Sequence, residues 1–190
     1  MKKKINIISK ETLFDGYFQL QKVKVSFETF QGKILDPVDR INFIVGNVSA
    51  AIVYNTDTKK ILLVEQFRLP TMHFGDDWLV EIVAGISDTD EKPEETIERE
   101  MMEEIGYRPV KLKNISAFHT APGSVTELVT VFYAEVNESS KVSCGGGFDE
   151  GEDIRVLEYS WDKVWGLLQR GLIRDAKTLI AVYWMKNKYY

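Results

Sequence analysis

The chain has 190 residues and a mass of 21.8 kDa, with 44% hydrophobic residues, 28% charged residues and a net charge of −5. This composition is typical of one globular domain, or of one domain with an extension, and it excludes collagen-like, low-complexity and long disordered architectures. No apolar stretch approaches the roughly 20 residues of a membrane helix, so we expect no membrane partner. The basic start lacks the apolar core of a secretory signal, and the single Cys144 fits a reducing compartment, which predicts a cytoplasmic protein.

Acidic residues are concentrated in one segment of the chain. Residues 88–104 contain nine acidic and two basic side chains and carry a charge of −7, whereas the rest of the chain carries +2. Such a concentration of negative charge repels a phosphate backbone, so we expect no nucleic-acid partner. Carboxylates are also the ligands that hard divalent cations prefer, so the same segment is a candidate metal site.

The first half of the chain is predicted to be mostly extended. Weak polar–apolar alternation over the first forty-five residues, for example at residues 17–27, predicts extended chain there. Apolar runs predict further strands at residues 48–54, 61–67 and 78–84. The polar residues 55–57 predict a hairpin turn, and Gly85 is expected to end the last of these strands.

A helix is predicted to begin at Pro93, whose fixed φ suits the first helical turn, and to end at Gly106. Its apolar stripe consists of Ile97, Met101 and Ile105, which recur every four residues. Three later strands are predicted at residues 112–118, 128–136 and 154–159, and two terminal helices at residues 160–170 and 175–188. This order of elements predicts an α+β protein with a mixed sheet.

The most informative pattern spans residues 85–107. It is written Gly85-x5-Glu91-x7-Arg99-Glu100-Met101-x-Glu103-Glu104-x-Gly106-Tyr107. Residues three and four apart share one helix face, so Glu100 is expected beside Glu103 and Glu104, where like charges repel. Mg²⁺ would relieve that repulsion while it binds substrate phosphates. Arg99 is expected to bridge to Glu95 or Glu103 and to hold a carboxylate in position.

This pattern resembles the Nudix box, the signature of hydrolases that act on a nucleoside diphosphate linked to another group. Every glycine, glutamate and arginine of the box is present, and only its two aliphatic positions differ, holding Met101 and Tyr107. The resemblance implies a Nudix fold: α+β, with a mixed β-sheet sandwiched by helices and an amino-terminal β extension. Residues 1–48 would then serve dimerisation and nucleotide contacts, and residues 49–190 would form the hydrolase domain. The simpler alternative is a solvated acidic helix face, which the glycines and Arg99 at fixed offsets disfavour.

Four further segments narrow the resemblance. Residues 66–68, 122–127, 145–154 and 173–178 resemble the ADP-ribose and nucleoside-diphosphate-sugar branch of these hydrolases, and the similarity extends over residues 17–186. The implied reaction is hydrolysis of the pyrophosphate bond of a nucleotide sugar, with Mg²⁺ as the cofactor and Mn²⁺ as the alternative ion. GDP-mannose, giving GMP and mannose 1-phosphate, is the favoured substrate. The alternatives are an ADP-ribose pyrophosphatase and a non-catalytic nucleotide-binding domain. This branch also implies a homodimer.

The resemblance assigns roles residue by residue. The expected metal ligands are the Ala84 carbonyl, Glu100, Glu104 and Glu152. The expected catalytic residues are Glu152, which would orient the attacking water, its rival Glu150, and Glu103. The expected substrate-binding residues are Tyr17, Arg40, Arg68, Gly85, Glu127 and Lys177.

Some of these residues also have a purely structural interpretation. Arg68 ends a strand and would then be solvated, Tyr17 would pack in the core, and Glu127 would be an exposed edge residue. Lys177 lies near the start of a helix, where a cation opposes the helix dipole, and this placement favours a functional role for it.

Overall fold

The computed structural model describes residues 3–88, 90–147 and 153–190. The chain divides into two compact units. The N-terminal unit consists of Met1–Asn47 with His119–Leu128, and the core unit consists of Val48–Phe118 with Val129–Tyr190. Among the described residues, every buried hydrophobic side chain belongs to the core unit.

Three antiparallel strands build the N-terminal unit: β1 (Ile5–Asp15), β2 (Gln19–Phe27) and the first part of β3 (Val38–Asn55). The predicted strand at residues 17–27 is confirmed as β2. The strand β1 lies in the stretch that was expected to form an amino-terminal β extension, and two bulges interrupt its pairing with β2. Every residue of β1 is exposed, so this strand contributes no buried side chain to its unit.

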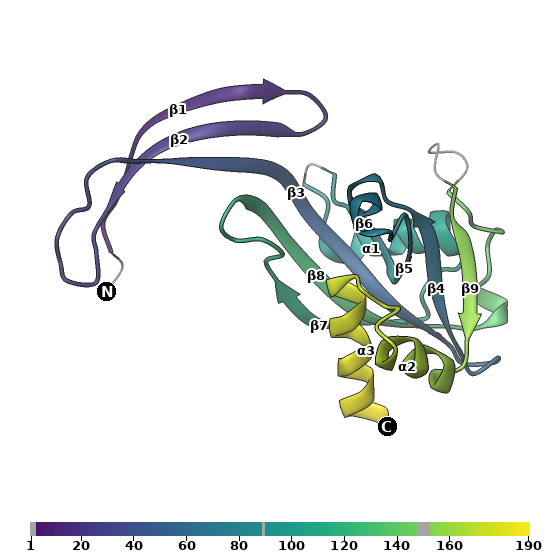
Figure 1. The fold of residues 1–190 in the computed structure, drawn as a ribbon. Coiled ribbons are helices and arrows are strands. Elements are labelled where there is room, and N and C mark those ends of the chain that lie inside the picture. The colour runs from purple at the N-terminus through teal and green to yellow at the C-terminus, as the bar shows by residue number, and fades with distance from the viewer. Residues whose placement is uncertain (1–2, 89, 148–152) are drawn as a thin grey trace. The chain divides into compact units, whose positions relative to one another are not determined.

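The core unit contains a sheet organised around the second part of β3 and β4 (Lys60–Phe67) (Figure 1). β4 pairs antiparallel with β5 (Trp78–Glu81) and β9 (Arg155–Tyr159). β3 pairs with β4, β6 (Val83–Ile86) and β8 (Val125–Val136), and β8 pairs with β7 (Lys111–Phe118). Phe43 N–H donates to Ser124 O and Thr56 N–H to Val136 O, so β3 and β8 run in the same direction and the sheet is mixed.

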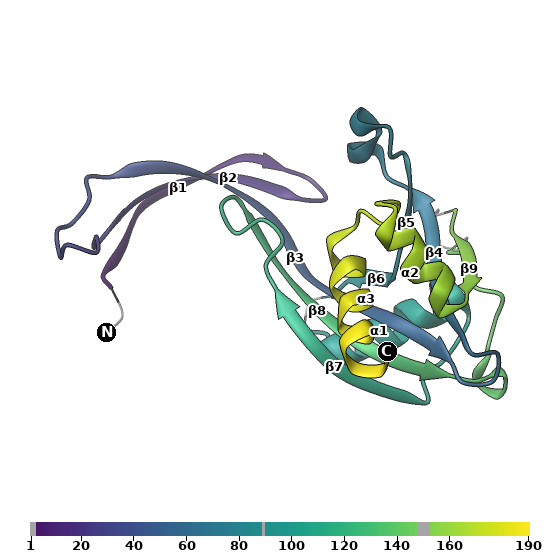
Figure 2. The same cartoon turned by 60° about the horizontal axis from the view of Figure 1, so that its bottom comes forward.

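Helices cover both faces of this sheet (Figure 2). On one face α1 (Pro93–Glu100) continues into a π-helical turn, η2 (Met101–Ile105). On the other face lie α2 (Trp161–Gln169) and α3 (Ala176–Tyr189). Two short 3₁₀ helices, η1 (Leu69–Phe74) and η3 (Glu138–Ser140), connect strands. The predicted α+β class is confirmed, and in the described part of the chain no helix has the length and hydropathy of a membrane span.

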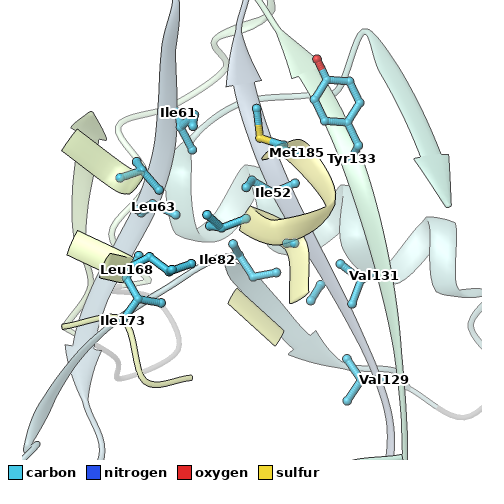
Figure 3. Packing of buried hydrophobic residues seen from close by; sticks show 14 residues of the cluster. Ile52, Ile61, Leu63, Ile82, Val129, Val131, Tyr133, Leu168, Ile173 and Met185 are labelled. Atoms are coloured by element: carbon cyan, nitrogen blue, oxygen red, sulfur yellow. The ribbon is translucent and has the colours of Figure 1, made fainter. Parts of the chain in front are cut away.

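Alternation along β3 divides the core into two hydrophobic clusters. Ala50 and Ile52 belong to the cluster under α2 and α3, whereas Ala51 and Val53 belong to the cluster under α1. Figure 3 shows the first cluster, in which Ile52 of β3, Ile82 between β5 and β6, and Met185 of α3 converge. Because one strand packs helices on both of its faces, α1 is held at a defined position against β3 and β6.

The predicted single strand at residues 78–84 is wrong. The structure has two strands there, β5 and β6, which are separated at Ile82 and pair with β4 and β3 respectively. At the break, Ile82 N–H donates to Thr178 Oγ1 at 2.9 Å instead of to a neighbouring strand. Gly85 does not end the strand either, since β6 continues through it to Ile86. A hydroxyl from α3 therefore fixes the point where the chain changes sheet partner.

We predict that Thr178→Val destabilises the fold. Valine keeps the shape but leaves the buried Ile82 N–H without its acceptor, which costs about 1–3 kcal/mol in the free energy of unfolding. Urea denaturation measures the difference. Thr178→Ser keeps the hydroxyl and is the matched control. Equal stability of the valine and serine variants would contradict the role of this bond.

Candidate active site

The guanidinium of Arg99 is the centre of the acidic segment. Its Nη1 donates to Glu100 Oε1 at 2.7 Å and to Glu103 Oε2 at 2.9 Å. Its Nε and Nη2 donate to the two oxygens of Glu91, each at 3.3 Å. The predicted bridge to Glu103 is thus present, whereas Glu95 accepts instead from Lys92 N–H at the start of α1. One cation therefore holds three of the carboxylates that the sequence brings together.

These hydrogen bonds shift the pKa values of Glu91 and Arg99. The hydrogen bond from Arg99 is the main cause of a lowered pKa of Glu91, and Thr96 adds to it with a second hydrogen bond. Burial alone would lower the pKa of Arg99, but its bonds to Glu91 and the charges of Glu100 and Glu103 outweigh burial and raise it. Glu91 and Arg99 are therefore both favoured in their charged forms, and the guanidinium reduces the repulsion between the carboxylates that it bonds.

Glu100 and Glu104 are buried although both are acidic, with exposed fractions of 9% and 3%. Gly85 in β6 makes room for the first of them, because a Cβ at Gly85 would lie 1.8 Å from Glu100 Oε1. Ala84, the predicted carbonyl ligand, precedes Gly85 in the same strand. The predicted ligands Ala84 and Glu100 thus come from adjoining parts of β6 and α1.

A π-helical turn carries the end of the acidic helix. In η2 the Gly106 N–H bonds to Met101 O, five residues back, and Gly106 adopts the left-handed conformation that ends the helix. Met101 and Tyr107, the two departures from the aliphatic positions of the motif, both pack in the cluster under α1. The departures are therefore accommodated in the core and leave the charged positions unaltered.

The donor set suits a divalent ion, since carboxylate and carbonyl oxygens are the ligands of Mg²⁺. Across residues 3–88, 90–147 and 153–190, no group of three acidic, histidine or cysteine side chains is gathered as a metal site. The predicted ligand Glu152 and its rival Glu150 lie outside the described residues. The complete ligand set stays a prediction, with Glu100 and Glu104 as its buried part.

A second charged cluster surrounds Glu81 at the end of β5. Arg68 donates to it from Nε at 2.8 Å and from Nη2 at 3.1 Å, and the Lys177 ammonium bonds to the same carboxylate. Asp175 lies 3.0 Å from the Lys177 nitrogen. The predicted substrate contacts Arg68 and Lys177 are thus brought together, because both bond to the Glu81 carboxylate.

Burial would raise the pKa of Glu81, but the hydrogen bonds and charges of Arg68 and Lys177 outweigh it and lower that pKa. Burial would likewise lower the pKa of Lys177, and the charges of Glu81 and Asp175 raise it instead. Glu81 was missed by the sequence analysis. Its signal is a glutamate inside an otherwise apolar strand, because a buried charge needs a partner.

The other predicted substrate contacts belong to the N-terminal unit. Tyr17 is 87% exposed and touches Phe18 edge to face, with ring centroids 4.6 Å apart, so it is not a core residue. Arg40 lies exposed on β3, with its Nη1 bonded to Asp39 O. Glu127 is half-buried on β8, and its carbonyl oxygen lies 2.9 Å from His119 Nδ1. Their roles stay predictions.

A strand glycine against the buried Glu100 carboxylate, with an arginine that bridges Glu100 to two further glutamates, is the arrangement expected of a Nudix-type site. The model of the NUDIX domain matches residues 46–181, and the chain belongs to the Nudix family of pyrophosphohydrolases. Among curated relatives, the GDP-mannose pyrophosphatase of Salmonella paratyphi B is 34% identical over 195 residues, covering 100% of this chain and 98% of that protein. The GDP-mannose pyrophosphatase of Cronobacter sakazakii is 34% identical over 184 residues, covering 94% and 93%.

One solved structure has a fold similar to that of this chain. A crystal structure of an ADP compounds hydrolase aligns with a TM-score of 0.73 and 18% identity, covering 98% of this chain and 96% of that chain. At that identity the likeness concerns the fold. The Nudix fold expected from the motif is confirmed.

We predict that Gly85→Ala lowers activity while the protein stays folded. The new methyl group displaces the Glu100 carboxylate, a flexible side-chain end, so the cost falls on the site and not on the core. Turnover of a nucleotide sugar should fall by about tenfold or more, because a carboxylate ligand is moved. Steady-state kinetics and circular dichroism measure the two effects.

Gly166→Ala is the matched control for this substitution. Gly166 lies in α2, its φ is not positive, and nothing lies within 4 Å of an added Cβ. This variant should keep full activity. Full activity of Gly85→Ala would show that Glu100 does not need its observed position.

Proposed function

We propose that this chain hydrolyses the pyrophosphate bond of a nucleotide sugar with Mg²⁺ or Mn²⁺, and that GDP-mannose is its favoured substrate. The observation that carries the proposal is the pair of buried carboxylates, Glu100 and Glu104, on one helical segment, with Glu100 packed against Gly85. Relatives that share a third of their residues over the whole chain bear the name GDP-mannose pyrophosphatase, which supports the substrate. ADP-ribose is the alternative substrate.

In this mechanism water attacks one phosphorus atom and the bond from that phosphorus to the bridging oxygen breaks. With GDP-mannose the products are GMP and mannose 1-phosphate, and the water proton passes to a carboxylate, for which Glu152 or Glu150 is proposed. A bound divalent ion supplies charge neutralisation of the diphosphate and lowers the pKa of water. Arg99 holds Glu100 and Glu103 in position. Arg68 and Lys177 are proposed to contact phosphate oxygens.

The non-catalytic alternative, a domain that only binds a nucleotide, is disfavoured by the retained charges. Such a domain has no need to bury carboxylates at the cost of desolvation, yet Glu100 and Glu104 are both buried here. A cytoplasmic location is part of the proposal and rests on the single Cys144 and on the class of substrate.

A panel of nucleotide sugars and ADP-ribose, assayed for phosphate monoester products, tests the proposal. We expect hydrolysis that requires added Mg²⁺ or Mn²⁺, with GDP-mannose giving the highest kcat/KM. Glu104→Gln should lower turnover by about 100-fold even at saturating metal, because it removes one anionic ligand. Glu98→Gln makes the same chemical change on the exposed side of α1 and is the control. Full turnover of the Glu104→Gln variant, or no hydrolysis of any compound by the wild type, would refute this function.

We also propose that the chain forms a homodimer through the N-terminal unit. The register of β1 on β2 places Ile5 opposite Phe27 and Ile7 opposite Val25, so these four side chains share one face of the strands. Ile5 and Ile7 are both exposed although they are apolar. An exposed edge strand with an apolar face invites pairing with another chain, and a second copy related by a twofold axis covers both faces at once.

Light scattering at micromolar concentration tests the dimer. We expect a mass of twice the 21.8-kDa chain mass. Ile7→Glu places a charge on the apolar face, where Ile7 is 52% exposed, and should shift the mass towards one chain. Ser9→Glu introduces the same charge on the opposite face, beside Lys24, and should leave the dimer intact. A wild-type mass of one chain would contradict the proposal.

A further inference from the structure

Glu81 has more positive charge around it than its own charge requires. It is 2% exposed, and Arg68 alone offers a bidentate pair of N–H donors to its two oxygens. Such a pair already neutralises and hydrogen-bonds a buried carboxylate. Yet the Lys177 ammonium also bonds to Glu81 Oε2, the oxygen that accepts from Arg68 Nη2. Two cations are therefore held close together on one carboxylate, and Asp175, 3.0 Å from the Lys177 nitrogen, is the second anion that offsets their repulsion.

The position of Lys177 is fixed by the start of α3. Asp175 caps this helix by accepting from the Thr178 N–H at 2.9 Å, and it lies 3.0 Å from the Lys177 nitrogen. Thr178 in turn accepts from the Ile82 N–H, next to Glu81 in the chain. The ammonium is thus tied to the sheet through its helix cap as well as through Glu81. Its side chain is only 14% exposed, so it has little freedom to move elsewhere.

Glu81 and the Gly85–Glu100 contact lie on the same face of the strands. Glu81 is paired with Val64, and Val64 and Val83 both belong to the cluster under α1. Directly paired residues share a face, so Glu81 lies on the face of Val64, and Gly85 lies on the face of Val83, two residues before it in β6; both faces are on the α1 side. Glu81, which binds the two cations, and Gly85, which contacts Glu100, are therefore four residues apart in the chain and on the same side of the sheet.

We propose that Glu81 is a positioning residue that holds Arg68 and Lys177 side by side as a two-cation site for a phosphate group of the substrate. The inference rests on the proposed function and adds a residue that the sequence pattern does not include. Glu81 engages Nε and Nη2 of Arg68, so the edge of the guanidinium that carries Nη1 is directed away from it. Phosphate is a bidentate acceptor that matches a guanidinium, and an adjacent ammonium adds a second positive charge.

The charge balance explains how the two cations are held side by side before a phosphate binds. Within the cluster the charges of Arg68 and Lys177 equal those of Glu81 and Asp175, so the resting site is neutral and stable without substrate. Arg68 is the outer member, with a side chain that is 37% exposed, whereas Glu81 is closed off from solvent. A phosphate group would therefore meet the cations from the Arg68 side, with the carboxylates behind them.

Binding of inorganic pyrophosphate, measured by calorimetry in the presence of EDTA, tests the two-cation site independently of the sugar, base and metal. We expect the wild type to bind pyrophosphate and Glu81→Gln to bind it at least tenfold more weakly, because the neutral amide no longer holds both cations. With a hydrolysed nucleotide sugar, the same variant should raise KM at least tenfold while kcat changes less than threefold. A merely structural role of Glu81 would lower stability without this split between KM and kcat.

Asp76→Asn is the matched control. Asp76 accepts from Arg174 Nη1 at 2.5 Å, and this ion pair also joins the residues before β5 to those before α3, but it lies outside the cluster. The control should keep wild-type binding of pyrophosphate. If Glu81→Gln does not fold, Glu81→Asp replaces it in the test. Its shorter side chain keeps the charge but cannot reach both cations, so it should also bind pyrophosphate more weakly.

The proposal is overturned if the wild type does not bind pyrophosphate, or if the folded Glu81 variant binds it as tightly as the wild type does. Its fate is separable from that of the proposed function. Weaker pyrophosphate binding by Glu81→Gln, together with no hydrolysis across the nucleotide-sugar panel, would leave the two-cation site standing and refute the reaction. Hydrolysis of a nucleotide sugar by the wild type, together with unchanged pyrophosphate binding by Glu81→Gln, would support the reaction and refute the two-cation site.

Discussion

The bridge from Arg99 to Glu91, Glu100 and Glu103 is the interaction on which the rest of the site depends. Carboxylates at helical spacing repel one another, and burial makes that repulsion more costly. One guanidinium with donors on three nitrogens compensates for this cost by bonding to all three acids. Glu100 can then lie against Gly85 instead of turning towards solvent, and α1 can pack closely on β6. The acidity of the segment is thus compatible with a folded helix.

The break between β5 and β6 connects this helix side of the sheet with α3. A continuous strand would satisfy Ile82 N–H within the sheet, but here the hydroxyl of Thr178 accepts from it. The first turn of α3, which contains Thr178, also contains Lys177 and begins at its cap, Asp175. The Lys177 ammonium bonds to Glu81 at the end of β5. A backbone hydrogen bond, a helix cap and an ion cluster therefore stabilise one another, and each would be weakened by the loss of its neighbour.

Much of the fold could be predicted because its signals are local. Pro93 begins α1 and Gly106 ends the helical segment, as their backbone preferences dictate. Ser160 and Asp175 cap α2 and α3 through their own side chains. The split at Ile82 was missed because its cause is a side chain 96 residues away. A hydrogen-bond acceptor that is distant in the chain does not change the local pattern of polar and apolar residues.

The sequence by itself determined the family, the helix that carries the carboxylates and the glycine that gives them room, since all three are encoded by spacing along one segment of 23 residues. Only the tertiary structure decided which charges pair between separate elements. Arg99 forms an ion pair with Glu91, which lies in the loop before its helix, and Lys177 forms one with Glu81, which lies on a strand far away in the chain. The physical reason is that helical spacing makes neighbours of residues three or four apart, whereas a buried charge is satisfied by whatever the packing of separate elements brings to it.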